Sequence, residues 1–425
     1  MTDPDVATDD FDDIYDESAP QHSPIAVTDF QPWHHPRKHW ARLNHLCHNA
    51  RRLIRDTDFQ DDFTLRYLTL PGEAMLDVQS LQIVAKGGGE ELLDVQALGG
   101  AIDKPGVKLK YIGFNNYGTN ETRRNKQAYA ESIIRDEDTI HLESKIINEQ
   151  VQKIANIKSK AYADAENNGP YNIINIDLCG CLAAVPPERE ATYFQAIGQI
   201  LELQKRNMSK PFMMLITTKT EPHEFDPASL RGIISVYGDN FRENAEFKSQ
   251  FEECLQSQAD DLLGKLANGE AVPQEKLNMV FGVGLGKWLL QLMKPSAPHW
   301  DVSLEDICCY SIGEYEPNML SLAFRFTRVV EPVNDRAGLF ISALDGSTNT
   351  ATEEQLALAM LKKVAHIVNV DTLLDTDITT RNKLISQAGK FLEKAGYSAE
   401  KYTKWANELF INLTPTSVSP ASTGP

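Results

Sequence analysis

Polar residues follow several apolar runs of the sequence, at positions where a buried strand would end. Asp177 closes the run 171–178 (YNIINIDL), and an acid there is costly to bury unless it serves a ligand or a hydrogen-bond network. Asp177 is therefore the foremost catalytic candidate, with capping of the following turn or helix as the alternative. Asn115 and Asn116 follow the run 107–114, and an Asn side chain can hydrogen-bond two hydroxyls.

Other residues at the ends of apolar runs form the rest of a candidate ligand site. They are Leu70, Pro71 and Gly72 after 64–70, Glu143 and Ser144 at the end of 139–143, and Leu178 beside Asp177. Cys179 and Cys181 are candidate nucleophiles, but neither has an adjacent basic residue to lower its pKa. The favoured interpretation is that both are small buried residues without a chemical role.

Five of the ten histidines lie between His34 and His48, in the wording WHHPRKHWARLNHLCH. At 100° per residue the segment is an amphipathic helix, and one stripe carries His45, His48, Arg52 and Arg55. Such a stripe suits phosphates and nucleic-acid bases, and a solvated helix face is the alternative. A metal-dependent hydrolase is a third hypothesis, but no complete ligand motif accompanies the histidines, and we expect no metal.

The string Gly282 to Lys287 (GVGLGK) resembles a phosphate-binding loop only in composition. Its spacing differs from GxxxxGK[ST], and Trp288 stands where Ser or Thr would bind magnesium. Close packing of a glycine-rich helix is the favoured interpretation.

The chain has 425 residues with 42% hydrophobic and 24% charged residues, which is typical of a globular protein of two or three domains. No apolar run is long enough for a transmembrane helix, and the acidic start is unlike a signal peptide, so we expect a cytoplasmic protein without membrane contact. Six dispersed cysteines predict reduced thiols.

Half of the net charge of −18 lies in residues 1–30, which contain nine acids and no Lys or Arg. That composition predicts a disordered acidic tail. The next segment, 31–56, holds the basic amphipathic helix. The expected order then continues with a main domain at 57–332, a linker at 333–352, a helical domain at 353–412 and a tail at 413–425.

Apolar runs alternate with helical patterns up to residue 235, which predicts βα units and a mostly parallel sheet. The expected strands are 64–70, 107–114, 139–143, 171–178 and 212–217, and the expected helices between them are 74–85, 121–135, 146–165 and 188–206. Two later runs, 306–312 and 318–329, predict an antiparallel hairpin. The expected fold class is α/β, with a doubly wound, mostly parallel sheet, a late antiparallel hairpin and a small C-terminal helical domain. Ligands bind such sheets at the carboxyl ends of the strands, where the candidate residues lie.

This element order resembles the class I S-adenosylmethionine (SAM) dependent methyltransferases, over residues 60–330. The resemblance implies that Leu70, Pro71 and Gly72 form the turn beside the methionine part of SAM, although one glycine stands where the family has two or three. It implies that Asn115 and Asn116 meet the ribose, in place of the family's acid. It also implies that Glu143 and Ser144 face the adenine.

The fourth strand resembles the family's fourth motif, which implies that Asp177 and Leu178 lie beside the transferred methyl group. One hypothesis is therefore a methyltransferase acting on a nucleic acid, held by 37–55, or on another macromolecule. The alternative is a non-catalytic subunit that binds a protein partner through its C-terminal helices. The wording PRKHW, YLTLPGE and NIDLCGCL resembles bacterial proteins of antiviral defence gene clusters, which implies no mechanism.

Overall fold

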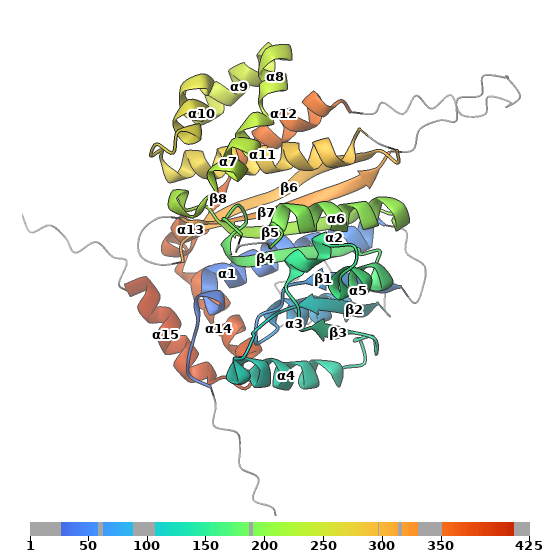
Figure 1. Ribbon diagram of the computed structural model, residues 1–425. Helices are drawn as coiled ribbons and strands as arrows, with labels where there is room; N and C mark the ends of the chain where they lie inside the picture. Colours follow the sequence, from blue (N-terminus) through green and yellow to red (C-terminus); the bar gives the residue numbers. More distant parts are fainter. Residues whose placement is uncertain are drawn as a thin grey trace, which may run out of the picture.

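The computed structural model describes residues 27–57, 63–87, 107–186, 190–295, 297–312, 317–329 and 351–411 (Figure 1). The tails expected at 1–30 and 413–425 and the linker expected at 333–352 fall almost entirely outside these residues. Among the described helices, none is both long and apolar enough to cross a membrane.

The strands form one sheet in the order β3-β2-β1-β4-β5-β7-β6-β8. Neighbours among β1 to β5 run parallel, whereas β7 is antiparallel to both β5 and β6. The α/β class, the mostly parallel sheet and the late antiparallel hairpin are thereby confirmed. The strands are β1 (Thr64–Thr69), β2 (Lys108–Phe114), β3 (Lys145–Ile147), β4 (Ile173–Cys181), β5 (Phe212–Lys219), β6 (Trp300–Tyr310), β7 (Met319–Arg328) and β8 (Val368–Asn369).

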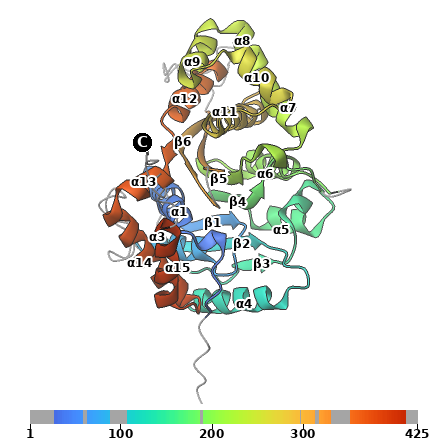
Figure 2. The same ribbon diagram turned by 90° about the vertical axis from the view of Figure 1, so that its left-hand side faces the viewer.

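Helices cover both faces of the sheet (Figures 1 and 2). The first face packs against η3 (Val151–Ala155), α5 (Lys160–Asn168), α6 (Tyr193–Asn207), α11 (Gln274–Met293) and α12 (Glu353–Val364). After β5 the chain continues through η4 (Pro222–Glu224) and α7 (Pro227–Ser235). Above α11 lie α8 (Gly238–Glu243), α9 (Ala245–Leu255) and α10 (Ala259–Ala267) (Figure 1).

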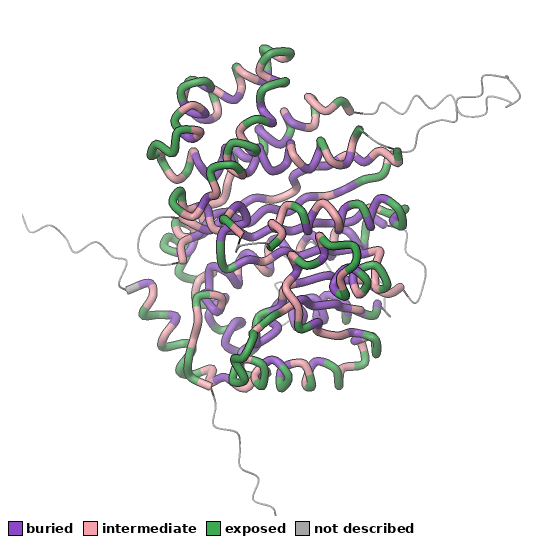
Figure 3. The backbone as a smooth tube through the Cα atoms, viewed as in Figure 1, coloured by how far each residue is buried: buried purple, intermediate pink, exposed green. Residues whose placement is uncertain are grey.

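The second face packs against the N-terminal helices, the two helices that flank β2 in the sequence, and the last three helices of the chain. These elements are η1 (Pro32–His34), α1 (Pro36–Ala41), η2 (Arg42–Cys47), α2 (His48–Asp56), α3 (Leu76–Ala85), α4 (Glu121–Arg135), α13 (Val370–Thr376), α14 (Ile378–Lys394) and α15 (Ala399–Ile411). Figure 2 shows α1 between the sheet and α13 to α15. Figure 3 shows that buried residues follow the sheet and the helices lying directly on it.

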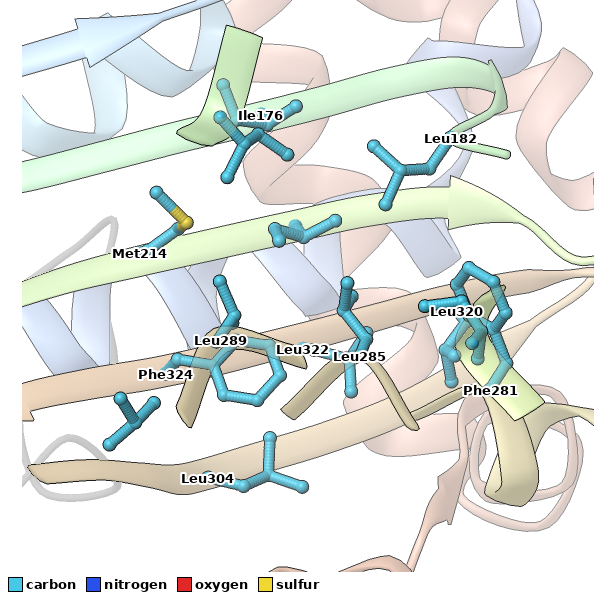
Figure 4. Packing of buried hydrophobic residues seen from close by; sticks show 14 of the residues in the cluster. Ile176, Leu182, Met214, Phe281, Leu285, Leu289, Leu304, Leu320, Leu322 and Phe324 are labelled. Atoms are coloured by element: carbon cyan, nitrogen blue, oxygen red, sulfur yellow. The ribbon is translucent and has the colours of Figure 1, made fainter. Parts of the chain in front are cut away.

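Alternate residues of the central strands form the hydrophobic core of the first face. Ile176, Met214, Leu322 and Phe324 point from β4, β5 and β7 toward α11, where Leu285 and other apolar residues meet them (Figure 4). Because the intervening residues of each strand face the other core, every central strand is buried on both sides.

The helices at 353–411 do not form a separate domain. Residues of α12 belong to the core of the first face, and residues of α13 to α15 belong to the core of the second. Between them, β8 pairs with β6 at Cys308 and Cys309. The expected helical domain is therefore an integral part of the sheet's two covering layers.

Two expected elements differ from the structure. The run 139–143 meets β2 through a single bridge at Ile140, and the third strand is 145–147 instead. The helix expected at 146–165 is divided into β3, η3 and α5. A strand of three residues at the edge of a sheet leaves too short an alternation to be recognised.

The string 282–287 lies inside α11, so the phosphate-loop alternative is wrong and close packing is confirmed. A Cβ on Gly284 would stand 2.6 Å from the Ile233 side chain and 3.2 Å from its carbonyl oxygen. We expect Gly284→Ala to lower the free energy of unfolding by about 1–3 kcal/mol, because the added methyl overpacks this contact. Gly198→Ala in α6 is the control, since nothing lies within 4 Å there, and it should be neutral or stabilising in urea denaturation.

Candidate functional site

A cavity of about 330 Å³ opens at the carboxyl ends of β1, β2, β3 and β4. It lies where the strand order reverses between β1 and β4, the position at which open α/β sheets bind ligands. Its walls come from the turn after β1, the segments after β2 and β3, the end of β4, and the N-terminal helices. The polar and aromatic residues that line it are Trp33, Lys38, Arg42, Asp77, Asn115, Asn116, Tyr117, Arg123, Glu149, Gln150, Gln152, Asp177, Cys179 and Tyr193.

Most of the residues expected at the strand ends meet in this cavity. Leu70, Pro71, Gly72, Asn115, Asn116, Asp177 and Leu178 all line it. Glu143 and Ser144 do not, because they precede β3 instead of following it. Glu143 forms an ion pair with Lys110, and the buried Ser144 hydroxyl accepts a hydrogen bond from the Tyr111 amide at 3.2 Å. Glu149 and Gln150 follow β3 and take the place expected for Glu143 and Ser144.

The turn after β1 is shaped by two unusual backbone positions. Met75 has a φ of 48° although it is not a glycine, and it is completely buried immediately before α3. Non-glycine residues with positive φ are uncommon and gather at functional sites. Gly113 is required because a Cβ there would stand 2.8 Å from the Pro71 ring. Together these positions bring the turn and the start of α3 against the end of β2.

Asp177 forms an ion pair with Lys38 of α1, at 2.7 Å between Nζ and Oδ1. The Lys38 side chain is 5% exposed and that of Asp177 is 20% exposed. Burial disfavours the ammonium charge, but the Asp177 carboxylate outweighs this effect and raises the Lys38 pKa above its ordinary value. Asp177 therefore lines the cavity as one half of a charged pair with a buried lysine.

Two opposite charges in the cavity have no ionic partner among the described residues. The Arg42 guanidinium lies 3.2 Å from His39 Nδ1, with no carboxylate at ion-pair distance in the described part of the chain. The Asp77 carboxylate accepts hydrogen bonds from Tyr67 at 2.7 Å and Thr69 at 2.5 Å. These neutral donors keep Asp77 in place without cancelling its charge, so the cavity offers one cation and one anion to a ligand.

Aromatic rings and a guanidinium form the outer wall. Arg123 lies 4.8 Å from the ring centroids of both Trp33 and Tyr117, a distance suited to cation–π contacts. Glu73, which is 2% exposed, lies 3.2 Å from Arg123 and fixes its position. The Trp33 indole N–H is buried without a hydrogen-bond partner in the described structure, so it is a donor that a ligand could engage.

The N-terminal helix does not present the expected basic stripe to solvent. His45 is 3% exposed and lies 3.1 Å from the Ser321 hydroxyl, and burial lowers its pKa to about 4. His48 is partly buried, and Arg52 lies 3.0 Å from Glu305. Of the four residues, Arg55 alone is largely exposed. These four residues therefore do not form one exposed stripe, because η2 packs against β7 and α3, and Arg52 is paired with a carboxylate of β6. Nucleic-acid binding by this helical segment stays a prediction.

The histidines between 34 and 48 do not gather around one point. Within the described residues, Glu221, His223 and Glu224 are the one group of three potential metal ligands close to one another. The Lys219 ammonium lies 3.0 Å from Glu224 and 3.7 Å from Glu221, so it already offsets one of the two negative charges of this group. Cys179 is exposed at the cavity rim, and Cys181 is buried, which raises its pKa to about 12.

Several cavity residues were missed from the sequence. Lys38 and Arg42 are four residues apart on one helical path, and that spacing was a signal, but the helix was assigned to a separate surface. The chain is π-helical over Arg42–Cys47, an uncommon conformation that is frequent at functional sites and that the pattern does not reveal. Asp77 follows β1 by eight residues, in an otherwise apolar helix start, which was a recognisable signal.

The fold is that of an α/β protein with a cavity at the switch point of its sheet. The chain belongs to the PP_RS20740-like family, which it matches over residues 27–87 and 88–407. The matched residues include the whole cavity wall. A comparison with curated proteins finds no match.

Proposed function

We propose that the cavity binds S-adenosylmethionine. The observation that carries this proposal is the pair of unneutralised opposite charges, Arg42 and Asp77, in a cavity at the switch point. The methionine part of SAM bears a carboxylate and an ammonium group, which these two side chains complement. Burial strengthens both interactions, because a charge-assisted hydrogen bond gains in a low dielectric.

The rest of the wall suits the other parts of the cofactor. Asn115 donates its amide N–H to the Pro71 carbonyl at 2.6 Å, which leaves its amide oxygen for a ribose hydroxyl. Glu149 and Gln150 supply polar groups beyond β3, and Val151, Leu178 and Tyr193 supply apolar surface for a base. The cavity volume lies within the range of small-molecule and cofactor sites. The order of the strands agrees with the resemblance to class I methyltransferases.

When bound, SAM would supply a methyl group on a sulfonium for in-line displacement, which needs alignment more than acid–base chemistry. Asp177 and the backbone at the end of β4 would orient the reacting groups. Methyl transfer to a macromolecule is the activity we propose for this site. The basic stripe that suggested a nucleic acid as acceptor is largely buried or paired, so no acceptor class follows from it.

A second candidate is a non-catalytic SAM-binding subunit. It is favoured by the Lys38 ammonium, which stays charged beside Asp177 and prevents that carboxylate from acting as a free base. A methyl acceptor that must lose a proton would then need another base. Methylation assays on fractionated cell extract with radiolabelled SAM separate the two candidates, once binding is established.

Arg42→Gln is expected to weaken the binding of SAM and of its demethylated product by about tenfold to a hundredfold. The reason is the loss of a charge-assisted contact of about 1.5–3 kcal/mol. Isothermal titration of the full chain measures this effect, and Arg55→Gln on the exposed part of the same helical segment is the matched control. If the unaltered protein binds neither compound at millimolar concentration, the proposal is wrong.

A further inference from the structure

Residues 27–41 form a segment that supplies the cavity with Trp33 and Lys38 and leads directly into Arg42. This segment is held from outside by the loop between α14 and α15. The Val27 amide donates to the Gly396 carbonyl at 2.9 Å, and the Ser398 amide donates to the Val27 carbonyl at 3.0 Å. Val27 is thereby fixed to residues about 370 positions later in the sequence.

An aromatic cluster continues this attachment. The Phe30 ring lies 5.4 Å from the rings of Tyr402 and Trp405 and 6.1 Å from that of Tyr397. The Tyr402 hydroxyl donates to the His34 carbonyl at 2.8 Å. These contacts enclose the chain immediately before and after Trp33.

Ionic contacts fix the residue next to Lys38. Arg37 pairs with Asp371 of α13 and lies 4.7 Å from the ring centroid of Phe410 in α15. Asp371 also accepts hydrogen bonds from the amide and the hydroxyl of Ser311 at 2.8 Å, which ties α13 to the end of β6. The backbone that carries Lys38 is therefore held by α13 and α15 on the side opposite the cavity.

A second link reaches the outer wall of the cavity. The Tyr397 hydroxyl donates to Glu73 at 2.9 Å, and Glu73 holds Arg123. One loop between α14 and α15 thus contacts both the N-terminal segment and the turn after β1.

We propose that segment 27–41 and helices α13 to α15 form a latch. The latch positions the cationic wall of the cavity, which consists of Lys38 and Arg42, so that latch closure and ligand binding are coupled. Phe30 and Tyr397 are positioning residues, since neither lines the cavity. The coupling is reciprocal, because a ligand that requires Lys38 and Arg42 in place stabilises the closed latch by the same factor. The identity of the ligand rests on the function proposed above, but the positioning role does not.

Phe30→Ala tests the latch, with Phe241→Ala as the matched control. Both rings are partly buried members of aromatic clusters, but Phe241 lies in α8, where it packs on Phe247 and Phe251. Without any ligand, we expect amide hydrogen exchange at 38–47 and 72–77 to become at least about fivefold faster in Phe30→Ala and to stay unchanged in Phe241→Ala. Unchanged exchange at these residues in Phe30→Ala overturns the proposal.

The demethylated product of SAM is the probe for the coupling. We expect it to bind Phe30→Ala at least about fivefold more weakly and to slow exchange at 389–402 in the unaltered protein. Equal affinity for both proteins overturns the coupling and leaves the cofactor proposal intact, whereas no binding to the unaltered protein overturns the cofactor proposal alone. Should Phe30→Ala fail to fold, Tyr397→Phe replaces it, because this variant keeps the ring and removes the hydrogen bond to Glu73. Faster amide exchange at 72–77 in Tyr397→Phe supports the latch, and unchanged exchange there overturns it.

Discussion

Lowering the pH from 7 to 5 is expected to remove on the order of 5 kcal/mol from the free energy of unfolding. Burial lowers the pKa of His34 and of His35 to about 3, and that of His45 to about 4, from an ordinary 6.5. Between pH 6.5 and 4 these histidines therefore bind protons in the unfolded chain but stay neutral in the folded protein. Each of these histidines lowers the free energy of unfolding by roughly 2 kcal/mol at pH 5. Burial also lowers the pKa of His39, which adds to the loss. This stability is fully present above pH 6.5 and is lost as the pH falls.

The size of this effect matters because small proteins have only about 5–15 kcal/mol of total stability. Urea denaturation between pH 7.5 and 5 measures it as the slope of the unfolding free energy against pH. His45→Gln should reduce the slope below pH 6 by about 1.4 kcal/mol per pH unit, the contribution of one proton. His223→Gln is the control, since its side chain is 77% exposed. A free energy that stays flat from pH 7.5 to 5.5 would contradict the buried, neutral state of these histidines.

The sequence was sufficient for the elements whose patterns are long and local. Helix α4 occupies Glu121–Arg135 as expected, and β1, β2, β4 and β5 lie within a few residues of the expected runs. Their polar ends meet because parallel strands place their carboxyl ends along one edge. Position along the sequence was thus enough to predict that Asp177, Asn115 and Asn116 lie together, and they line one cavity.

The cationic wall was not predictable in the same way, because it depends on contacts between distant parts of the chain. A helical wheel separates apolar from polar residues, but it cannot show that α13 and α14 cover the polar side of α1. The pattern therefore does not reveal that the Lys38 ammonium group is buried against Asp177. The same distant contacts bury His34, His35 and Arg37, three polar residues that composition alone assigns to the surface.

Removing Asp177 is expected to destabilise the fold more than removing Lys38. Asp177→Ala leaves the buried Lys38 ammonium without its partner, and the loss of one partner of a buried pair costs about 3–5 kcal/mol. Lys38→Met leaves the Asp177 carboxylate, which is 20% exposed at the cavity and can be hydrated there. The double variant should recover part of the loss, giving a coupling energy of about 2–3 kcal/mol in urea denaturation.

The pH dependence of Asp177→Ala separates an unpaired charge from simple loss of packing. Without the carboxylate, burial outweighs the remaining effect of Cys179 and, together with the nearby Arg42 charge, places the Lys38 pKa below the ordinary 10.5. The unfolded chain then binds more protons than the folded one, so the stability of Asp177→Ala should rise from pH 7 to pH 9 relative to the unaltered protein. Lys38→Met combined with Asp177→Ala has no such charge and should not show this rise. Equal pH profiles for Asp177→Ala and the double variant would mean that the Lys38 ammonium reaches solvent, and that the ion pair does not hold the cavity wall together.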